Sequence, residues 1–358
     1  MDSNAHIIEY WEKQPDVLKE IMDNAVERTR DFVGLFQKTD PTGIYLIGSG
    51  TSLNAEEAVA PYLREVLDME VSVMPSSCIG KIQGERPLIV FVSQGGSSTN
   101  TLKAMDQLKD YPFITVTGEE KCEIASRSTY HMTIGCGLEN VGPKTLGYTS
   151  SVMILYMMAT EAARVCGKIS EEEYGNIRGD MYSGLENMRY NMEAAKKWMK
   201  DNSADMAEIE NYLFIGHGVT ASALKEGCLK VLETIKKPAL SYEFEEYLHG
   251  PILFMNERVG GFLFVSGEGE EKERFEKLAA CQKKYSRNTY IITTDEKIKG
   301  TKVLHIRQTG KSYTEVFETV VVPQLVSVSV QEYLGIEDGA EIYDEYTAVC
   351  PTKYNNGR

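Results

Sequence analysis

The sequence lacks several features that would place the protein in other classes. Its most apolar run, Val152–Ala159, falls far short of the roughly 20 residues that a membrane-spanning helix needs. The start, Met1–His6, is polar and has no basic region followed by an apolar core, so we expect no secretory signal and a cytoplasmic protein. The cysteines form no CxxC or other metal-ligand spacing, and their number, seven, is odd. We therefore expect reduced thiols, no disulfide framework and no metal site.

Positive charge is also scarce. The chain has 38 Lys and Arg against 53 Asp and Glu, which gives a net charge of −15. Nucleic acids and anionic membranes bind basic surfaces, so we expect neither as a partner. A small phosphorylated ligand remains compatible, because a local nest of backbone N–H groups can outweigh a distant negative field. The length of 358 residues predicts about two domains.

The strongest chemical signal lies in the stretch Leu88–Thr101. Its beginning, Leu88–Val92, is continuously apolar, which is typical of a strand buried in a parallel sheet. After a loop rich in Ser, Gly and Thr, the apolar residues Leu102, Met105 and Leu108 recur at near-helical spacing. The loop thus leads into a helix N-terminus, with free N–H groups and hydroxyls but no carboxylate, and this suits a phosphate. An ordinary Ser/Thr-capped turn is the alternative, since the P-loop lysine is absent.

Short apolar strands alternate with helical segments, which predicts a doubly wound parallel sheet. After amphipathic helices between residues 7 and 36, we expect strands at 44–47, 71–74, 88–92, 113–116 and 131–134. Segments 212–220, 261–266 and 290–294 echo three of these strands in the same order, so we expect an internal duplication. The second copy continues as Gly267–Glu271, whose carboxylates would repel a phosphate. The anion site is therefore expected in the first copy.

A second group of chemically active side chains follows in the second copy. Lys230 and Glu233 are three residues apart on an expected helix and can pair. Further on, His249 precedes Gly250-Pro251, which fixes a turn. A Glu that moves a carbon-bound proton and a His that opens a sugar ring would suit aldose–ketose chemistry. A solvated ion pair and a structural histidine remain open alternatives. The carboxylates of Glu243, Glu245 and Glu246 could receive a ligand's ammonium group, although we favour solvated charges.

Taken together, Gly48–Ser52, Ser93–Ser98, Glu233 and His249–Pro251 resemble the double sugar isomerase (SIS) domain family. The isomerase half of glucosamine-6-phosphate synthase and the fructosamine-6-phosphate deglycases belong to that family. The resemblance covers nearly the whole chain and implies an α/β fold of two tandem SIS domains, each a doubly wound, flavodoxin-like parallel sheet flanked by helices. It implies N-terminal helices at 1–36, a phosphate-binding first SIS domain at 37–195, a second SIS domain at 196–340, and a C-terminal tail at 341–358 that closes on the active site.

The resemblance also implies roles for residues at matching positions. A sugar 6-phosphate would be bound by the first-domain loops, through Gly50, Thr51, Ser52, Ser93, Gln94 and Ser98. Glu233 would move protons between C1 and C2, and Lys230 would line the same site. His249 would assist ring opening from the neighbouring subunit, so a homodimer or larger assembly with a shared site is implied. Lys353 is a weaker match to a lysine that closes over the sugar. No metal or other cofactor is implied.

Departures from the synthase indicate the type of reaction. No cysteine follows Met1 and no glutaminase half is expected, while Gly95 and Ser97 stand where the synthase has Ser and Glu. The segment Glu139–Thr149 resembles the deglycase branch more than the synthase. We therefore expect a deglycase that splits a 6-phosphorylated ketosamine, of the fructoselysine or glucoselysine 6-phosphate type, into a hexose 6-phosphate and a free amine. The alternatives are a phosphosugar isomerase or aminosugar-phosphate deaminase/isomerase, and a non-catalytic phosphosugar sensor.

Overall fold

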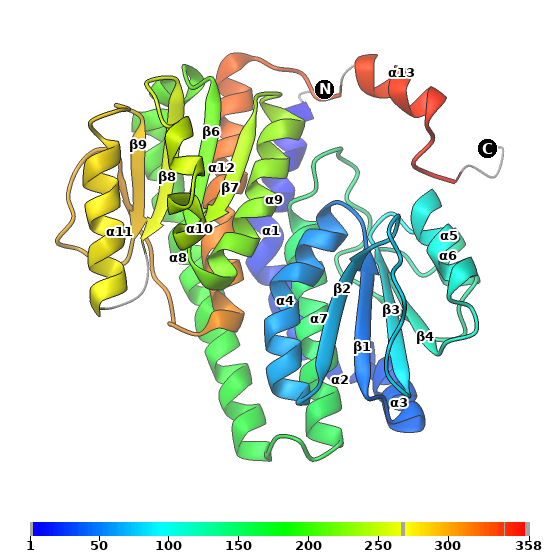
Figure 1. The fold of residues 1–358 in the computed structure, drawn as a ribbon. Helices are drawn as coiled ribbons and strands as arrows, with labels where there is room; N and C mark the ends of the chain where they lie inside the picture. The colour runs from blue at the N-terminus through cyan, green and yellow to red at the C-terminus, as the bar shows by residue number, and fades with distance from the viewer. Residues whose placement is uncertain (1–2, 266–268, 340, 355–358) are drawn as a thin grey trace. The chain divides into compact units, whose positions relative to one another are not determined.

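The computed structural model describes residues 3–265, 269–339 and 341–354 (Figure 1). The chain forms two compact units. The first unit comprises Asp16–Asn140, Lys144–Gly179 and Gly339–Arg358, and the second comprises Met1–Pro15, Val141–Pro143 and Asp180–Asp338. The division falls inside two helices, α1 (Ser3–Asp23) and α8 (Glu171–Ala207). Each unit is built around one parallel sheet.

The sheet of the first unit has the strand order β2-β1-β3-β4-β5, with all pairs parallel. Its strands are β1 (Gly43–Gly48), β2 (Glu70–Pro75), β3 (Pro87–Ser93), β4 (Phe113–Thr117) and β5 (His131–Thr133). Its helices are α2 (Ala25–Arg28), α3 (Arg30–Thr39), α4 (Thr51–Leu67), α5 (Thr99–Gln107), α6 (Glu123–Ser126), α7 (Leu146–Val165) and α13 (Glu341–Val349). Every residue of β3 is buried, as its continuous apolar sequence predicts. The apolar run at 152–159 forms the buried middle of α7.

The sheet of the second unit repeats this topology, with the order β7-β6-β8-β9-β10. Its strands are β6 (Asn211–Gly216), β7 (Ala239–Glu243), β8 (Val259–Val265), β9 (Thr289–Thr293) and β10 (Val303–His305). Its helical segments are α9 (Gly218–Thr234), α10 (Phe244–Leu248), the 3-10 turn η1 (Pro251–Phe254), α11 (Gly269–Gln282) and α12 (Ser312–Leu334). The identical strand order confirms the expected duplication and the α/β class with two doubly wound sheets.

The two copies also match where the chain leaves the first strand of each sheet. Gly48 at the end of β1 pairs with Pro75, and Gly216 at the end of β6 pairs with Glu243. Each strand is followed two residues later by a glycine with positive φ, 58° at Gly50 and 54° at Gly218. Strand order reverses between β1 and β3 in the first sheet, and ligands of doubly wound sheets bind at the carboxyl ends of such strands. The loops after β1 and β3 meet at this position.

Some details differ from the sequence-based expectation. The N-terminal region forms three helices, since the helical pattern is interrupted at Asn24 and Thr29. The edge strand β7 was not anticipated, because it is short and none of its residues is fully buried. Of the acidic stretch at 267–271 that was expected to repel phosphate, residues 267 and 268 lie outside the described residues, and residues 269–271 belong to the start of α11. Among the described helices, none is long and apolar enough to cross a membrane.

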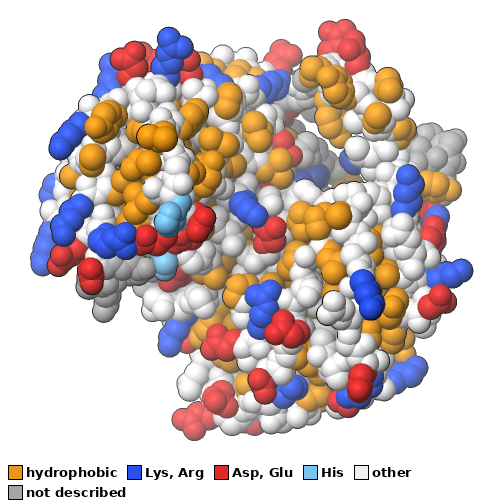
Figure 2. All heavy atoms as spheres, viewed as in Figure 1, with side chains coloured by type: hydrophobic (Ala, Val, Ile, Leu, Met, Phe, Trp, Pro, Cys, Tyr) orange, Lys and Arg blue, Asp and Glu red, His pale blue; other side chains and the backbone are white. Residues whose placement is uncertain are grey.

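Charge on the surface follows the composition. On the face that Figure 2 shows, acidic and basic side chains are interspersed, and the described basic residues gather into no continuous patch there.

Candidate active site

Two loops rich in hydroxyl groups lie side by side in the first unit. We call them the hydroxyl loops; they comprise Gly48–Ser52 after β1 and Ser93–Thr99 after β3. The Asn100 side chain joins them by donating a hydrogen bond from Nδ2 to Ser49 Oγ at 2.7 Å. Within the second loop, Ser93 Oγ and Ser98 Oγ lie 3.1 Å apart. The six residues expected to bind phosphate all belong to these loops: Gly50, Thr51, Ser52, Ser93, Gln94 and Ser98.

Both hydroxyl loops end at helix N-termini. Gly50 caps α4 with a left-handed backbone, and Ser98 caps α5 with an extended backbone. Gly50 has no side chain to cap α4, and the Ser98 hydroxyl makes no capping hydrogen bond to the first turn of α5. The helix dipoles and the hydroxyl groups therefore make a favourable environment for an anion.

The C-terminal segment pairs with the second hydroxyl loop. The Thr99 amide donates to the Thr352 carbonyl at 3.0 Å, and the Tyr354 amide donates to the Ser97 carbonyl at 2.7 Å. Lys353 itself forms an antiparallel bridge with Ser98. The structure therefore brings Lys353 beside a residue expected to bind phosphate, and a carbonyl of the tail occupies one amide at the start of α5.

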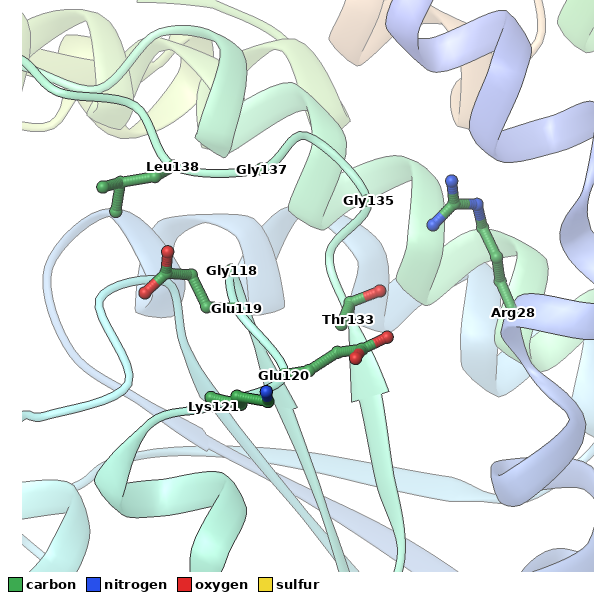
Figure 3. A pocket seen from close by; sticks show the side chains of 9 residues that line it. All are labelled: Arg28, Gly118, Glu119, Glu120, Lys121, Thr133, Gly135, Gly137 and Leu138. Atoms are coloured by element: carbon green, nitrogen blue, oxygen red, sulfur yellow. The ribbon is translucent and has the colours of Figure 1, made fainter.

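A pocket of about 470 Å³ opens at the carboxyl ends of β4 and β5 (Figure 3). Its charged lining residues are Arg28, Glu119, Glu120 and Lys121, and glycines 118, 135 and 137 form much of the remaining wall. No residue of the hydroxyl loops lines it. Its two carboxylates offset the charges of Arg28 and Lys121, so the lining has no net positive charge to attract a phosphate. The candidate site therefore rests on the hydroxyl loops and not on this pocket.

In the second unit, Lys230 lies between two carboxylates on α9. Its Nζ is 2.6 Å from Glu233 Oε2 and 3.0 Å from Glu226 Oε1. The side chains of Lys230 and Glu226 are 1% and 0% exposed, and that of Glu233 is 35% exposed. Burial alone would lower the pKa of Lys230, yet the two carboxylates raise it above its ordinary value. The pair of Lys230 and Glu233 is therefore not a solvated ion pair, and Glu233 is the member that solvent reaches.

The role of Glu226 as a second partner of Lys230 was not predicted from the sequence. It stands four residues before Lys230, which is a pairing distance on a helix. The same spacing occurs on solvated helix faces, so only the packing of α9 against α12 shows that this pair is buried.

His249 lies at the carboxyl end of α10 and is exposed. The next residue, Gly250, has a φ of 147°, a conformation that favours glycine, and Pro251 then opens η1. The turn is thus fixed as the sequence predicts. No hydrogen bond or ion pair joins the His249 side chain to another described residue. In the same turn Leu253 is 90% exposed.

The acidic residues before His249 have structural partners. Glu243 accepts hydrogen bonds from the amides of Glu245 and Glu246 and so caps α10. Its other oxygen lies 2.7 Å from His217 Nδ1. Glu245 forms an ion pair with Arg274. The carboxylates of Glu243 and Glu245 therefore have partners within the chain, and the role of this acidic cluster towards a ligand stays a prediction.

Comparisons with known proteins agree with this architecture. No family model matches the chain. A glutamine–fructose-6-phosphate aminotransferase (isomerizing) from Arabidopsis thaliana is 28% identical over 225 residues, which cover 60% of this chain and 32% of that protein. A solved protein from Clostridium difficile, named as a phosphosugar isomerase, superposes with a TM-score of 0.89 at 28% identity and covers 98% of this chain and 99% of its own. The C-terminal domain of glucosamine-fructose-6-phosphate aminotransferase from Francisella tularensis superposes with a TM-score of 0.80 at 18% identity, covering 93% of this chain and 97% of its own.

The extent of these similarities limits what they establish. The chain spans between 22% and 50% of the length of the first curated relatives that it matches. The solved structures, in contrast, match the chain along almost its whole length. The similarity therefore covers a fold of two tandem phosphosugar isomerase-type domains, which corresponds to one part of the longer relatives.

Proposed function

We propose that this chain, which consists of two tandem SIS domains related to the isomerase part of glucosamine-6-phosphate synthase, is a cytoplasmic ketosamine-6-phosphate deglycase. Its substrate would be a 6-phosphorylated ketosamine of the fructoselysine or glucoselysine type, and its products a hexose 6-phosphate and a free amine. The observation that carries the proposal is the ion pair of Glu233, a solvent-accessible carboxylate, with the buried Lys230. The same chain also has the two uncharged hydroxyl loops, which suit a phosphate.

The hydroxyl loops would bind the phosphoryl group. Ser52, Ser93 and Ser98 supply hydroxyl donors, and Gly50 and Thr51 supply backbone amides at the start of α4. Gln94 follows Ser93 in the second hydroxyl loop. The helix dipoles favour the phosphate dianion at this position. Binding at the sugar's phosphorylated end would leave the carbonyl end free for chemistry.

The reaction would proceed through proton transfer at C1 and C2. The Glu233 carboxylate would take a proton from C1 of the open-chain ketosamine, while the C2 carbonyl oxygen takes up the proton that the substrate's ammonium nitrogen releases, which gives a C1=C2 enaminol. Glu233 would then return its proton to C2, so that C2 carries a hydroxyl and C1 becomes a protonated aldimine. Water would then add to C1, the C1–N bond would break, and the amine would leave with a proton. The ion pair with Lys230 would hold the Glu233 carboxylate in one position for the first transfer.

Two further residues would complete the site. His249 would help to open the sugar ring, acting on the site of a neighbouring subunit in a homodimer or larger assembly. The exposure of the His249 side chain, and of Leu253 in the same turn, supports a role in contact with another subunit. Lys353, held beside Ser98 by the C-terminal segment, would close over the bound sugar together with the tail at 341–358.

An assay with several substrates tests the proposed reaction. Purified protein is incubated with fructoselysine 6-phosphate, glucosamine 6-phosphate and a ketose 6-phosphate, each in a separate reaction. We expect glucose 6-phosphate and lysine in equal amounts from the first substrate. Turnover of glucosamine 6-phosphate alone would identify aminosugar deamination as the reaction. Turnover of the ketose alone would identify isomerisation, the reaction that the name of the Clostridium difficile protein states for that protein. Binding without turnover of any of them would favour a phosphosugar sensor.

A further inference from the structure

Glu139 and Gln94 come from different elements of the first unit and meet beside the hydroxyl loops. We propose that Glu139 is a positioning residue, which orients the Gln94 carboxamide so that its carbonyl oxygen accepts a hydroxyl group of the bound phosphosugar. The inference rests on the part of the proposed function that places a sugar 6-phosphate in the hydroxyl loops. The proposed contact would let the protein distinguish a phosphosugar from other phosphate-containing ligands.

Glu139 is held rigidly at the N-terminus of α7. It is 2% exposed, and its Oε1 accepts hydrogen bonds from the Thr145 amide at 2.9 Å and from the Leu146 amide at 3.3 Å. Its Oε2 accepts from the Gly147 amide at 2.9 Å. The Glu139 carboxylate thus occupies the free amides at the N-terminus of α7. A phosphate cannot bind these amides as well, so the N-termini of α4 and α5 remain for the phosphate of the ligand.

Gln94 is fixed from three sides. Its Nε2 donates to Glu139 Oε2 at 3.3 Å, and its backbone carbonyl accepts from the Gly118 amide at 2.9 Å. A Cβ at Gly147 would lie 1.5 Å from Nε2 and 2.4 Å from Oε1, so the carboxamide packs directly against this glycine. The side chain therefore has one position, which depends on both Glu139 and Gly147.

The carboxylate also fixes the polarity of the carboxamide. An ionised carboxylate can only accept hydrogen bonds, so the NH₂ group of Gln94 must face Glu139. Gln94 Oε1 then remains as an acceptor and has no hydrogen-bond partner among the described residues. A phosphate dianion offers no donor, whereas every sugar hydroxyl does. Gln94 Oε1 is therefore suited to a hydroxyl on the carbon chain next to the phosphate.

Calorimetric binding of fructose 6-phosphate and of inorganic phosphate tests the proposal in Glu139→Gln. Electrostatics alone predicts tighter binding of both anions, because the substitution removes a negative charge. Positioning predicts the opposite for the sugar: the affinity for fructose 6-phosphate falls by about 10- to 100-fold, the effect of one misplaced hydrogen bond, while that for inorganic phosphate falls far less. The matched control is Glu161→Gln, which removes another buried carboxylate of the first unit, paired with Arg164 and Tyr174.

Two further variants separate positioning from a structural role. In Gln94→Ala, the additional substitution Glu139→Gln should cause no further loss of sugar affinity, because the two residues act as one unit. Gly147→Ala leaves the charge unchanged and should favour the helix, yet its methyl group displaces the carboxamide. We expect Gly147→Ala to lose sugar affinity as Glu139→Gln does, without a fall in melting temperature.

The side-chain amide signal of Gln94 in a ¹⁵N–¹H spectrum of the ligand-free protein gives a readout that does not depend on sugar binding. It should shift in Glu139→Gln and stay in place in Glu161→Gln. Wild-type affinity for fructose 6-phosphate in Glu139→Gln and Gly147→Ala, or an additive loss in the double variant, would overturn the positioning role and leave the proposed function standing. Failure of the wild-type protein to bind fructose 6-phosphate would overturn both.

Discussion

Lys230 Nζ lies 3.0 Å from Glu226 Oε1, and both side chains are almost completely withdrawn from solvent. The second partner of the lysine, Glu233, is partly exposed. Two carboxylates therefore share one buried cation, and only one of them can reach a ligand. This division gives Glu226 a supporting role and leaves Glu233 as the group available for proton transfer.

Replacing Lys230 should destabilise the second unit. In Lys230→Met the carboxylate of Glu226 remains buried without its cation, and breaking a buried pair in this way costs about 3–5 kcal/mol. We expect the midpoint of urea denaturation to fall accordingly. The double variant Lys230→Met/Glu226→Gln should recover part of the loss, because it also removes the buried negative charge of Glu226. Equal stability of the single and double variants would contradict the buried pairing.

Glu56 should make stability depend on pH. It is 0% exposed, neither carboxylate oxygen has a hydrogen-bond partner in the described part of the chain, and Oε1 would lie 2.7 Å from a Cβ at Gly48. Burial, with a smaller contribution from Glu57, raises its pKa well above the ordinary 4.5. Above pH 4.5 the unfolded chain releases this proton and the folded one retains it, so the free energy of unfolding falls as the pH rises towards the raised pKa.

The variant Glu56→Gln removes this ionisation. We expect it to be more stable than the wild-type protein at pH 7 to 8, and we expect the difference to shrink as the pH falls to about 4.5. Thermal unfolding of both proteins across this range measures the effect. A constant difference at every pH would mean that Glu56 is not the titrating group.

Mixing two inactive variants tests the contribution of a neighbouring subunit. Glu233→Gln and His249→Asn should each reduce turnover by about 100-fold or more, as loss of a general acid or base does. If His249 acts on the site of another subunit, mixed assemblies contain one intact site and should regain up to about half of the activity of a dimer with two. No recovery after subunit exchange, verified by mass spectrometry, would place both residues in one subunit's site.

The C-terminal segment offers a further prediction. Lys353 is exposed and is placed beside Ser98 by backbone pairing, so Lys353→Ala should change stability little. If the lysine closes over the sugar, the variant should lose turnover while retaining affinity for inorganic phosphate. Tyr354→Ala, two positions beyond the Thr352 carbonyl in the same segment, would serve as a matched control. Wild-type turnover in Lys353→Ala would remove this residue from the mechanism.

The parts of the fold that the sequence predicted are those with strong local signals. Strand β3 was evident because its seven residues are all buried and its apolar run is continuous. The duplication was evident because strand and loop residues recur in order. Of the two three-residue edge strands, β5 was predicted and β10 was not. Strands this short contain too little apolar sequence for consistent recognition.

The site was predicted less completely, for physical reasons. The spacing of Lys230 and Glu233 indicates that the two side chains pair. The same spacing occurs on solvent-exposed helix faces and in protein cores, so it does not predict whether the pair is buried. Glu56 has the appearance of a surface charge, since it sits in a helix beside Glu57. The contact of Gln94 with Glu139 joins residues 45 positions apart, and it exists only because α7 begins beside the end of β3. Such relationships depend on tertiary packing, which local patterns do not contain.

The central claim is that Glu233 removes a proton from C1 of a 6-phosphorylated ketosamine. It is tested most directly with fructoselysine 6-phosphate that carries two deuterium atoms at C1. We predict slower turnover than with the unlabelled compound, glucose 6-phosphate that retains one deuterium at C1, and turnover that is about 100-fold or more lower in Glu233→Gln. A sugar product that keeps both deuterium atoms at C1, or equal turnover by Glu233→Gln, would contradict the claim.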